Sequence, residues 1–121
     1  MRSPGDGALV PTGEPEVRWL FTSRIRRIEA AVAAALEAEG IDRALILPPD
    51  VFGPHPTTDG GMFHLHGVPL VNYLTAPFYL FDSIDTLDKI HRPSLRPLTR
   101  ATIRLVEATA GASAQAFRTE G

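Results

Sequence analysis

The first half of the chain carries apolar residues at steps of three and four. They are Val17, Phe21, Ile25, Ile28, Val32 and Leu36. This spacing places the side chains on one face of a helix. Pro15 is favoured at a first helical position, because its missing amide proton has no helical acceptor, and Gly40 is a typical residue after a helix end. The pattern therefore predicts one long helix over residues 15–40.

A helix that begins at Thr22 or Ser23 is the alternative. It would place the arginines at positions 24, 26 and 27 in the first turn, where the positive end of the helix dipole disfavours cations. An earlier start puts Glu14 and Glu16 beside that end instead. The earlier start is therefore the one predicted.

Two short apolar runs predict buried strands at residues 44–47 and 68–74. The first run is closed by Pro48 and a second proline, which cannot continue a hydrogen-bonded ladder. The second run follows Gly67 and has Pro69 near its start, where a missing amide proton is tolerated.

Three further elements complete the prediction. Residues 61–66 suit a short helix that ends at a glycine, and residues 85–90 suit a turn or a single helical turn. A final helix begins at Ser94, whose side chain can cap the helix N-terminus, and ends near Gly111. Its buried stripe consists of Leu98, Ala101, Leu105 and Ala108.

The predicted order of elements is helix, strand, short helix, strand and helix, which is typical of an α/β domain. We expect a partial three-layer αβα domain with a small, mostly parallel sheet and two long helices over residues 15–111. A loop-rich segment precedes it at residues 1–14, with at most a short strand at 8–10, and a frayed tail follows at 112–121. Two strands leave a sheet edge without a neighbour, so the sequence predicts an oligomer or a partner-dependent chain.

Composition narrows the class of protein. The chain has 121 residues, enough for one domain, and its 44% hydrophobic content and net charge of -2 argue against a strongly basic nucleic-acid binder and a disordered acidic tail. It has no cysteine, which excludes disulfides and thiolate metal sites. Its start lacks a signal-peptide pattern, and no apolar run approaches the roughly 20 residues of a membrane helix. We therefore expect a soluble, cytoplasmic protein.

The most distinctive motifs lie in residues 57–89. Asp59 stands eight residues before Gly67 and ten before Pro69. A loop rich in Phe and Tyr follows the second predicted strand, and residues 85–89 then read DTLDK. We expect this stretch to be the one around which the chain is organised.

These motifs resemble the C-terminal part of the zinc aminopeptidase and glutaminyl-cyclase-like family, metallopeptidase family twenty-eight. The matching positions are Asp59, Phe63, Gly67, Pro69, Asp85, Thr86, Asp88 and Lys89. The resemblance implies hydrolysis at a peptide N-terminus by a zinc-activated water, on a peptide or a small amino-acid-containing substrate. It also implies that Asp59, Asp85 and Thr86 orient metal ligands or hold loop amides.

Departures from the family pattern concern the metal. The family's last zinc ligand, a His, corresponds to Phe81, and the His that follows the first Asp corresponds to Gly60. The family's other ligands would precede Met1. Asp82 lies beside the lost position, and it remains the candidate for an oxygen ligand because zinc accepts carboxylate. The resemblance thus implies a truncated domain that lacks ligands and binds no zinc on its own.

The aromatic loop offers Phe78, Tyr79 and Phe81, which either line a pocket for an apolar side chain or pack in the core. His64 and His66 would diverge by about 200° on a helix, which argues against a metal clamp. The chain shows no Ser–His–Asp or Cys–His signature and no phosphate-binding glycine loop.

His55 lies in a Gly-Pro-His-Pro loop, where a surface role is favoured.

The resemblance and its departures together predict a fragment or degenerate form of a zinc-dependent aminopeptidase-like metallopeptidase, inactive alone. One alternative is a non-catalytic interaction module that pairs its sheet edge with another chain. Another is one chain of a two-chain metalloenzyme, with the missing ligands supplied in trans.

Overall fold

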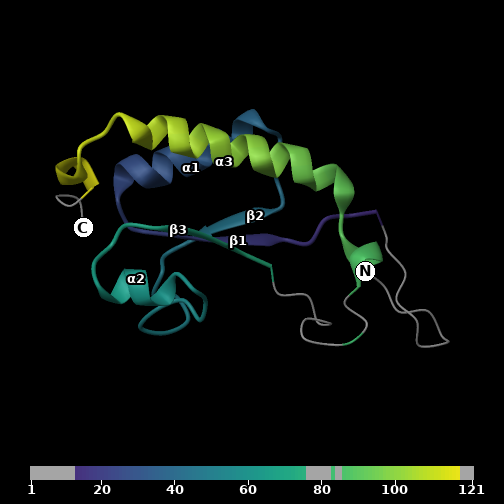
Figure 1. Cartoon of the computed structure of the whole chain (residues 1–121), viewed down its shortest axis with the longest axis horizontal. Helices are drawn as coiled ribbons and strands as arrows, with labels where there is room; N and C mark the ends of the chain where they lie inside the picture. Colours follow the sequence, from purple (N-terminus) through teal and green to yellow (C-terminus); the bar gives the residue numbers. More distant parts are fainter. Residues whose placement is uncertain (1–12, 76–82, 84–85, 118–121) are drawn as a thin grey trace.

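The computed structural model describes residues 13–75, 83 and 86–117. The strands are β1 (Arg18–Thr22), β2 (Ala44–Leu47) and β3 (Val71–Leu74), and the α-helices are α1 (Arg26–Ala38), α2 (Gly61–Leu65) and α3 (Leu95–Ala110). Three short 3-10 turns are η1 (Leu87–Lys89), η2 (Arg92–Ser94) and η3 (Ala114–Phe117). The chain is α/β as predicted, with two long helices (Figure 1).

The three described strands form one sheet in the order β2-β1-β3. β1 pairs in parallel with β2 and antiparallel with β3, so the sheet is mixed and the expected mostly parallel sheet is wrong. The strand register shows why β3 runs antiparallel to β1. Phe21 lies opposite Leu47 at the end of β2, and Thr22 lies opposite Val71 at the start of β3. The connection from β2 to β3 therefore returns at the same end of the sheet and does not cross over it.

The predicted helix from Pro15 is wrong over its first half, because residues 18–22 form the central strand β1. Leu20 points to the face covered by α1, whereas Phe21 packs against Phe52 of the loop after β2. Both are at most 3% exposed, so β1 is buried on its two faces. Burial and pairing with two neighbours outweigh the helical spacing of the apolar residues.

Helix α1 begins at Arg26, close to the alternative start at Thr22 or Ser23 and not at the predicted Pro15. Its N-cap is Ile25, without a side-chain cap, and Glu29 is the acidic residue of its first turn. The cost of arginines near the helix N-terminus is a few tenths of a kcal/mol up to about 1 kcal/mol when exposed. That cost is smaller than the gain from burying a central strand.

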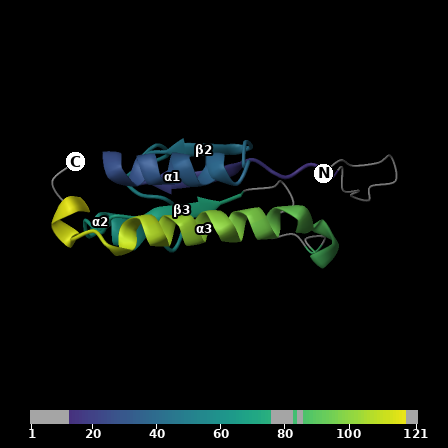
Figure 2. The same cartoon turned by 90° about the horizontal axis from the view of Figure 1, so that it is seen from above.

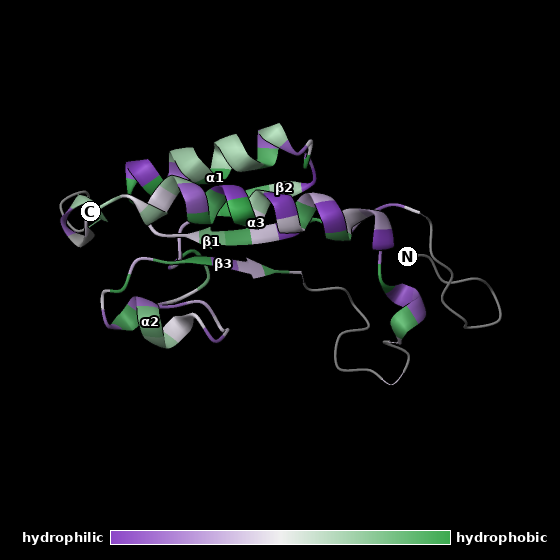
Figure 3. Ribbon diagram, turned by 45° about the horizontal axis from the view of Figure 1, so that its top comes forward, coloured by the Kyte–Doolittle hydropathy of each residue, from purple (hydrophilic) through white to green (hydrophobic). Residues whose placement is uncertain are grey.

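The core lies between the sheet and the two long helices. Helices α1 and α3 contact each other and run side by side over one face of the sheet (Figures 1 and 2). The buried cluster consists of Leu20, Ile25, Ile28, Val32 and Leu36, and helix α3 adds the buried Ala101 and the partly buried Leu105. Apolar and polar residues alternate along α3 in Figure 3, as expected for a helix with one buried face.

Helix α2 lies on the other side of the sheet from α1 and α3 (Figure 1). Gly67 ends it with a φ of 75°, and the amide of Val68 donates to the carbonyl of Phe63 at 2.9 Å, which is a Schellman-type end. The amide of Leu70 then donates to Ser23 Oγ at 2.8 Å. Because the amides at 68 and 70 are used in this way, β3 starts at Val71 and is shorter than predicted.

Residues 112–121 were predicted to form a frayed tail, and their described part, residues 112–117, differs from that expectation. Phe117, in the 3-10 turn Ala114–Phe117, packs against the core cluster. The guanidinium carbon of Arg27 lies 5.9 Å from the centre of its ring. Burial of an aromatic ring and a cation–π contact hold this part of the chain. Among the described helices, none is long and apolar enough to cross a bilayer.

Candidate functional site

Several predicted site residues lie outside the described residues. They are Phe78, Tyr79, Phe81, Asp82 and Asp85. The pocket expected from the aromatic loop and the oxygen ligand expected at Asp82 therefore stay predictions. Asp59 and Thr86 can be placed.

Asp59 is exposed in the turn before α2, next to a hydrogen-bonded network that it does not join. Thr58 Oγ1 donates to Asn72 Oδ1 of β3 at 2.7 Å and accepts from the amide of Gly60 at 3.2 Å. A Cβ at Gly60 would lie 2.3 Å from the same Asn72 oxygen. This network fastens the start of α2 to β3, and the residues that do so are Thr58 and Asn72.

Thr86 closes a turn with its neighbours Asp88 and Lys89. Its hydroxyl donates to Asp88 Oδ1, and Lys89 Nζ donates to Asp88 Oδ2 at 2.8 Å and to Thr86 Oγ1 at 3.1 Å. The hydrogen bond from Lys89 is the main cause that lowers the pKa of Asp88, and the bond from Thr86 adds to it. Within this turn, the charges of Asp88 and Lys89 pair with each other, and the Thr86 hydroxyl is hydrogen-bonded. The turn therefore presents no free nucleophile.

Two of the candidate histidines, His55 and His66, contact backbone carbonyls close to them in sequence. His55 Nδ1 contacts the carbonyl of Pro56 at 2.8 Å, and His66 Nδ1 contacts the carbonyl of Met62 at 2.7 Å. Within the part of the chain that the structure describes, no three His, Cys, Asp or Glu residues are grouped so as to hold a metal ion. A catalytic zinc needs about three protein ligands. The candidate oxygen ligand Asp82 lies outside the described residues, so the zinc site of the resembled family stays a prediction.

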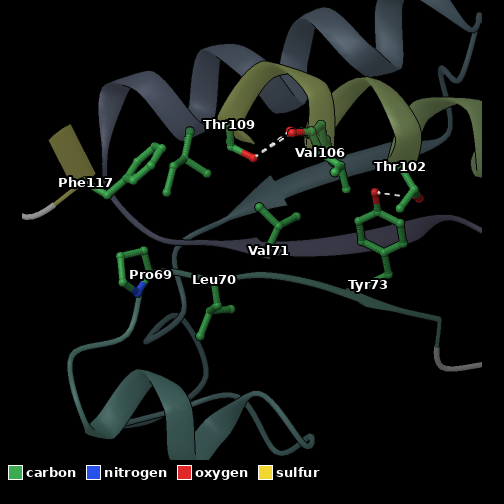
Figure 4. Close-up of a pocket in the computed structure, with 10 residues that line it drawn as sticks. Pro69, Leu70, Val71, Tyr73, Thr102, Val106, Thr109 and Phe117 are labelled. Atoms are coloured by element: carbon green, nitrogen blue, oxygen red, sulfur yellow. Dashed lines mark hydrogen bonds between the residues drawn. The ribbon is translucent and has the colours of Figure 1, made fainter. Parts of the chain in front are cut away.

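An open, mostly apolar groove of about 430 Å³ lies between β3 and α3 and is named here the α3 groove (Figure 4). Its lining residues are Ile28, Pro69, Leu70, Val71, Tyr73, Thr102, Leu105, Val106, Thr109 and Phe117. In Figure 4, Val71 and Tyr73 rise from β3 towards Val106 and Thr102 of the helix, and Phe117 lies at one end. Its volume falls in the range of about 300–1,000 Å³ that is usual for small-molecule sites.

The polar groups of the α3 groove are mostly engaged. Thr102 Oγ1 donates to the carbonyl of Leu98 at 2.9 Å and lies 3.1 Å from the hydroxyl of Tyr73, which must then be the donor of that contact. Thr109 Oγ1 donates to the carbonyl of Leu105 at 2.9 Å. The Tyr73 oxygen keeps its acceptor capacity. The groove therefore suits an apolar group with one hydrogen-bond donor near Tyr73.

Sequence reasoning missed the groove residues Tyr73 and Thr102, since only the fold brings them together. It also assigned Ser94 as the cap of α3, which is wrong, because the helix has no side-chain cap hydrogen bond. The Ser94 hydroxyl instead contacts His91 Nδ1. A His and a Ser three residues apart in a Pro-containing turn are the signal that would have indicated this pair.

Comparison with known proteins adds no assignment. No protein-family model, no curated relative and no solved structure matches the chain.

Proposed function

We propose that the chain is an aminopeptidase-like module of the zinc-exopeptidase type that binds a peptide or a small amino-acid-containing ligand, and that it does not hydrolyse this ligand on its own. The type of module rests on the sequence motifs that contain Asp59, Gly67, Pro69 and Thr86. The binding function rests on the α3 groove.

The chemistry of the groove favours such a ligand. Val71, Leu105 and Val106 provide an apolar wall for a side chain such as that of leucine. The Tyr73 oxygen can accept a hydrogen bond from an amine or an amide of the ligand. The described lining of the groove has no carboxylate, histidine or cysteine, and the hydroxyls of Thr102 and Thr109 donate to backbone carbonyls rather than to a general base.

The test uses leucine p-nitroanilide, which combines a leucyl side chain with an amide whose hydrolysis is visible by absorbance. Saturable binding by calorimetry is expected without release of p-nitroaniline, with or without added zinc. Val106→Asp should weaken binding by about tenfold or more, because a charge would border the apolar ligand. Val106 is 60% exposed, so this variant should fold.

Ile103→Asp is the matched control. Ile103 lies on the same helix, is 51% exposed and does not line the groove. Equal losses in the two variants would contradict binding in the groove. Turnover by the chain alone, with about one retained zinc per chain in elemental analysis, would contradict the proposal that it does not hydrolyse the ligand.

The second candidate function is an interaction module that pairs its sheet edge with another chain, including the case of a two-chain metalloenzyme. The observation that favours it is β2, which has a neighbour on one side in the described sheet. Its Leu45 and Ile46 are 50% and 37% exposed, which is unusual for parallel strands because these are normally covered. Sedimentation at micromolar concentration should detect self-association that Leu45→Lys reduces. A monodisperse, cooperatively unfolding monomer would contradict it.

A further inference from the structure

A second cavity lies at the N-terminal end of α3 and is independent of the α3 groove. Its volume is about 170 Å³, and it is named here the Arg18 cavity. Its lining residues are Pro15, Arg18, Glu39, Gly40, Ile41, Asp42, Arg43, Pro93, Ser94 and Pro97. Liquid water occupies about 30 Å³ per molecule, so the cavity has room for about five or six non-hydrogen atoms. This is the size of a small metabolite.

Three segments that are distant in sequence close the Arg18 cavity and are fastened to one another. Arg43 reaches Glu14 with an ion pair of 3.2 Å and the carbonyl of Pro15 with a hydrogen bond of 3.1 Å. Arg104 binds Glu39 Oε2 through its Nε at 2.7 Å. The Glu39 side chain is only 8% exposed. Arg43 and one oxygen of Glu39 are therefore already engaged by the protein.

The pair His91–Ser94 presents an acceptor to the cavity. His91 Nε2 lies 3.0 Å from the carbonyl of Gly13, which can only accept, so Nε2 carries the proton of the neutral imidazole. His91 Nδ1 is then an acceptor, and the Ser94 hydroxyl donates its proton to it. The lone pairs of Ser94 Oγ remain, and Ser94 lines the cavity.

Two charged side chains of the cavity lining, Arg18 and Asp42, are not paired by the described residues, and their charges are of opposite sign. Within the described residues, the guanidinium of Arg18 and the carboxylate of Asp42 have no ion pair or side-chain hydrogen bond. Burial lowers the pKa of Arg18, as expected for a cation that has lost water without gaining a partner. The cavity thus offers donors at Arg18 and acceptors at Asp42, Ser94 and the second oxygen of Glu39.

We propose that the Arg18 cavity binds a small zwitterionic amino acid, with its carboxylate on Arg18 and its ammonium group on Asp42, Glu39 and Ser94. A planar guanidinium matches a carboxylate in two parallel hydrogen bonds. The acceptors match an ammonium group, which only donates. A simple anion would face the two carboxylates, and a simple cation would face Arg18, so neither satisfies the cavity.

The test is a titration of the isotopically labelled chain with L-alanine, followed by NMR at the amides of Gly40 and Ser94. Saturable shifts are expected. Propionate and ethylammonium, which each lack one charge of the zwitterion, should bind at least about tenfold more weakly, since one charged hydrogen-bonding end is lost. Arg18→Met and Asp42→Asn should each weaken alanine binding by a similar factor. Asp42 is exposed, so its variant tests the proposal even if Arg18→Met does not fold.

The matched controls are Arg100→Met and Asp50→Asn, which remove the same charges at exposed positions outside the cavity. They should leave alanine binding unchanged. Equal affinity for propionate and alanine would show a plain anion site and overturn the proposal. It would also be overturned by shifts that do not saturate, or by a loss of binding as large in the controls. Failure here leaves the α3 groove untouched, because leucine p-nitroanilide lacks the carboxylate that Arg18 requires.

Discussion

Two regions of the chain differ in the interactions that hold them in the fold. The first, residues 18–47, contains β1, α1 and β2 and provides the whole buried apolar cluster around Leu20 and Val32. The second, residues 57–89, carries the motifs, and its described part contributes only the partly buried Val71 and Tyr73 to that cluster. It is held largely by hydrogen bonds, such as those of Thr58 with Asn72 and of Leu70 with Ser23.

This contrast corrects the expectation that residues 57–89 organise the chain. The described sheet is organised around β1, which has a neighbour on each side, and the motif-bearing region is attached to its edge. Conspicuous motifs therefore do not mark the structural centre of this molecule. Phe63 and Leu65 of α2 are 58% and 51% exposed, which supports the same conclusion.

The largest expected effect comes from truncating the centre of the first region. Leu20 is 1% exposed, and Leu20→Ala should lower the free energy of unfolding by about 2–5 kcal/mol. Leu65→Ala is the control in the second region and should change it by about 0.5 kcal/mol or less. Urea denaturation followed by circular dichroism measures both. Equal losses in the two variants would remove the contrast between the regions.

A smaller effect is expected where the second region is tightly packed. A Cβ at Gly61 would lie 2.5 Å from the carbonyl oxygen of Pro56 and 2.7 Å from His55 Nδ1. Gly61→Ala should therefore cost about 1–3 kcal/mol in the same unfolding experiment, because a backbone atom must move. Gly111→Ala is the control, since its Cβ would meet no atom within 4 Å. A neutral Gly61→Ala would show that the start of α2 is loosely attached.

The smallest effect concerns pH. The hydrogen bonds from Lys89 and Thr86 lower the pKa of Asp88 below its usual 3.8. Because the pKa of Asp88 is lower in the folded state, its ionised carboxylate stabilises the fold at pH values above the unfolded pKa. This stabilisation is lost as the pH falls through the folded pKa. NMR titration of the Asp88 carboxyl should give a value below 3.8, and Lys89→Met should raise it. A pKa that does not respond to this variant would show that the turn is open in solution.

Much of the secondary structure could be predicted from local signals. The C-terminal ends of β2, α3 and α2 follow from Pro48, Gly111 and Gly67. β1 could not be found in this way, because Phe21 and Ile25 continue the helical spacing of α1 by coincidence. What makes residues 18–22 a strand is pairing with β2 and β3, which is not local in sequence.

The candidate sites also divide into parts that local sequence signals predict and parts that only the fold brings together. The sequence predicted that residues 85–90 form a turn, and Thr86, Asp88 and Lys89 do form one. The α3 groove and the Arg18 cavity join side chains from separate elements, such as Tyr73 with Thr102 or Arg18 with Ser94. No spacing along the chain indicates such neighbours. They follow only from the sheet register and the packing of α3.

The position of β1 between two unlike neighbours also has a kinetic consequence. β2 lies closer to β1 along the chain than β3 does, so the unit β1–α1–β2 closes a shorter loop and loses less chain entropy. We expect this unit to form first during folding and β3 to dock afterwards. Pulse-labelling hydrogen exchange would show the order, and earlier protection of β3 would contradict it. Substitutions in residues 57–75 would then speed unfolding while leaving the folding rate nearly unchanged.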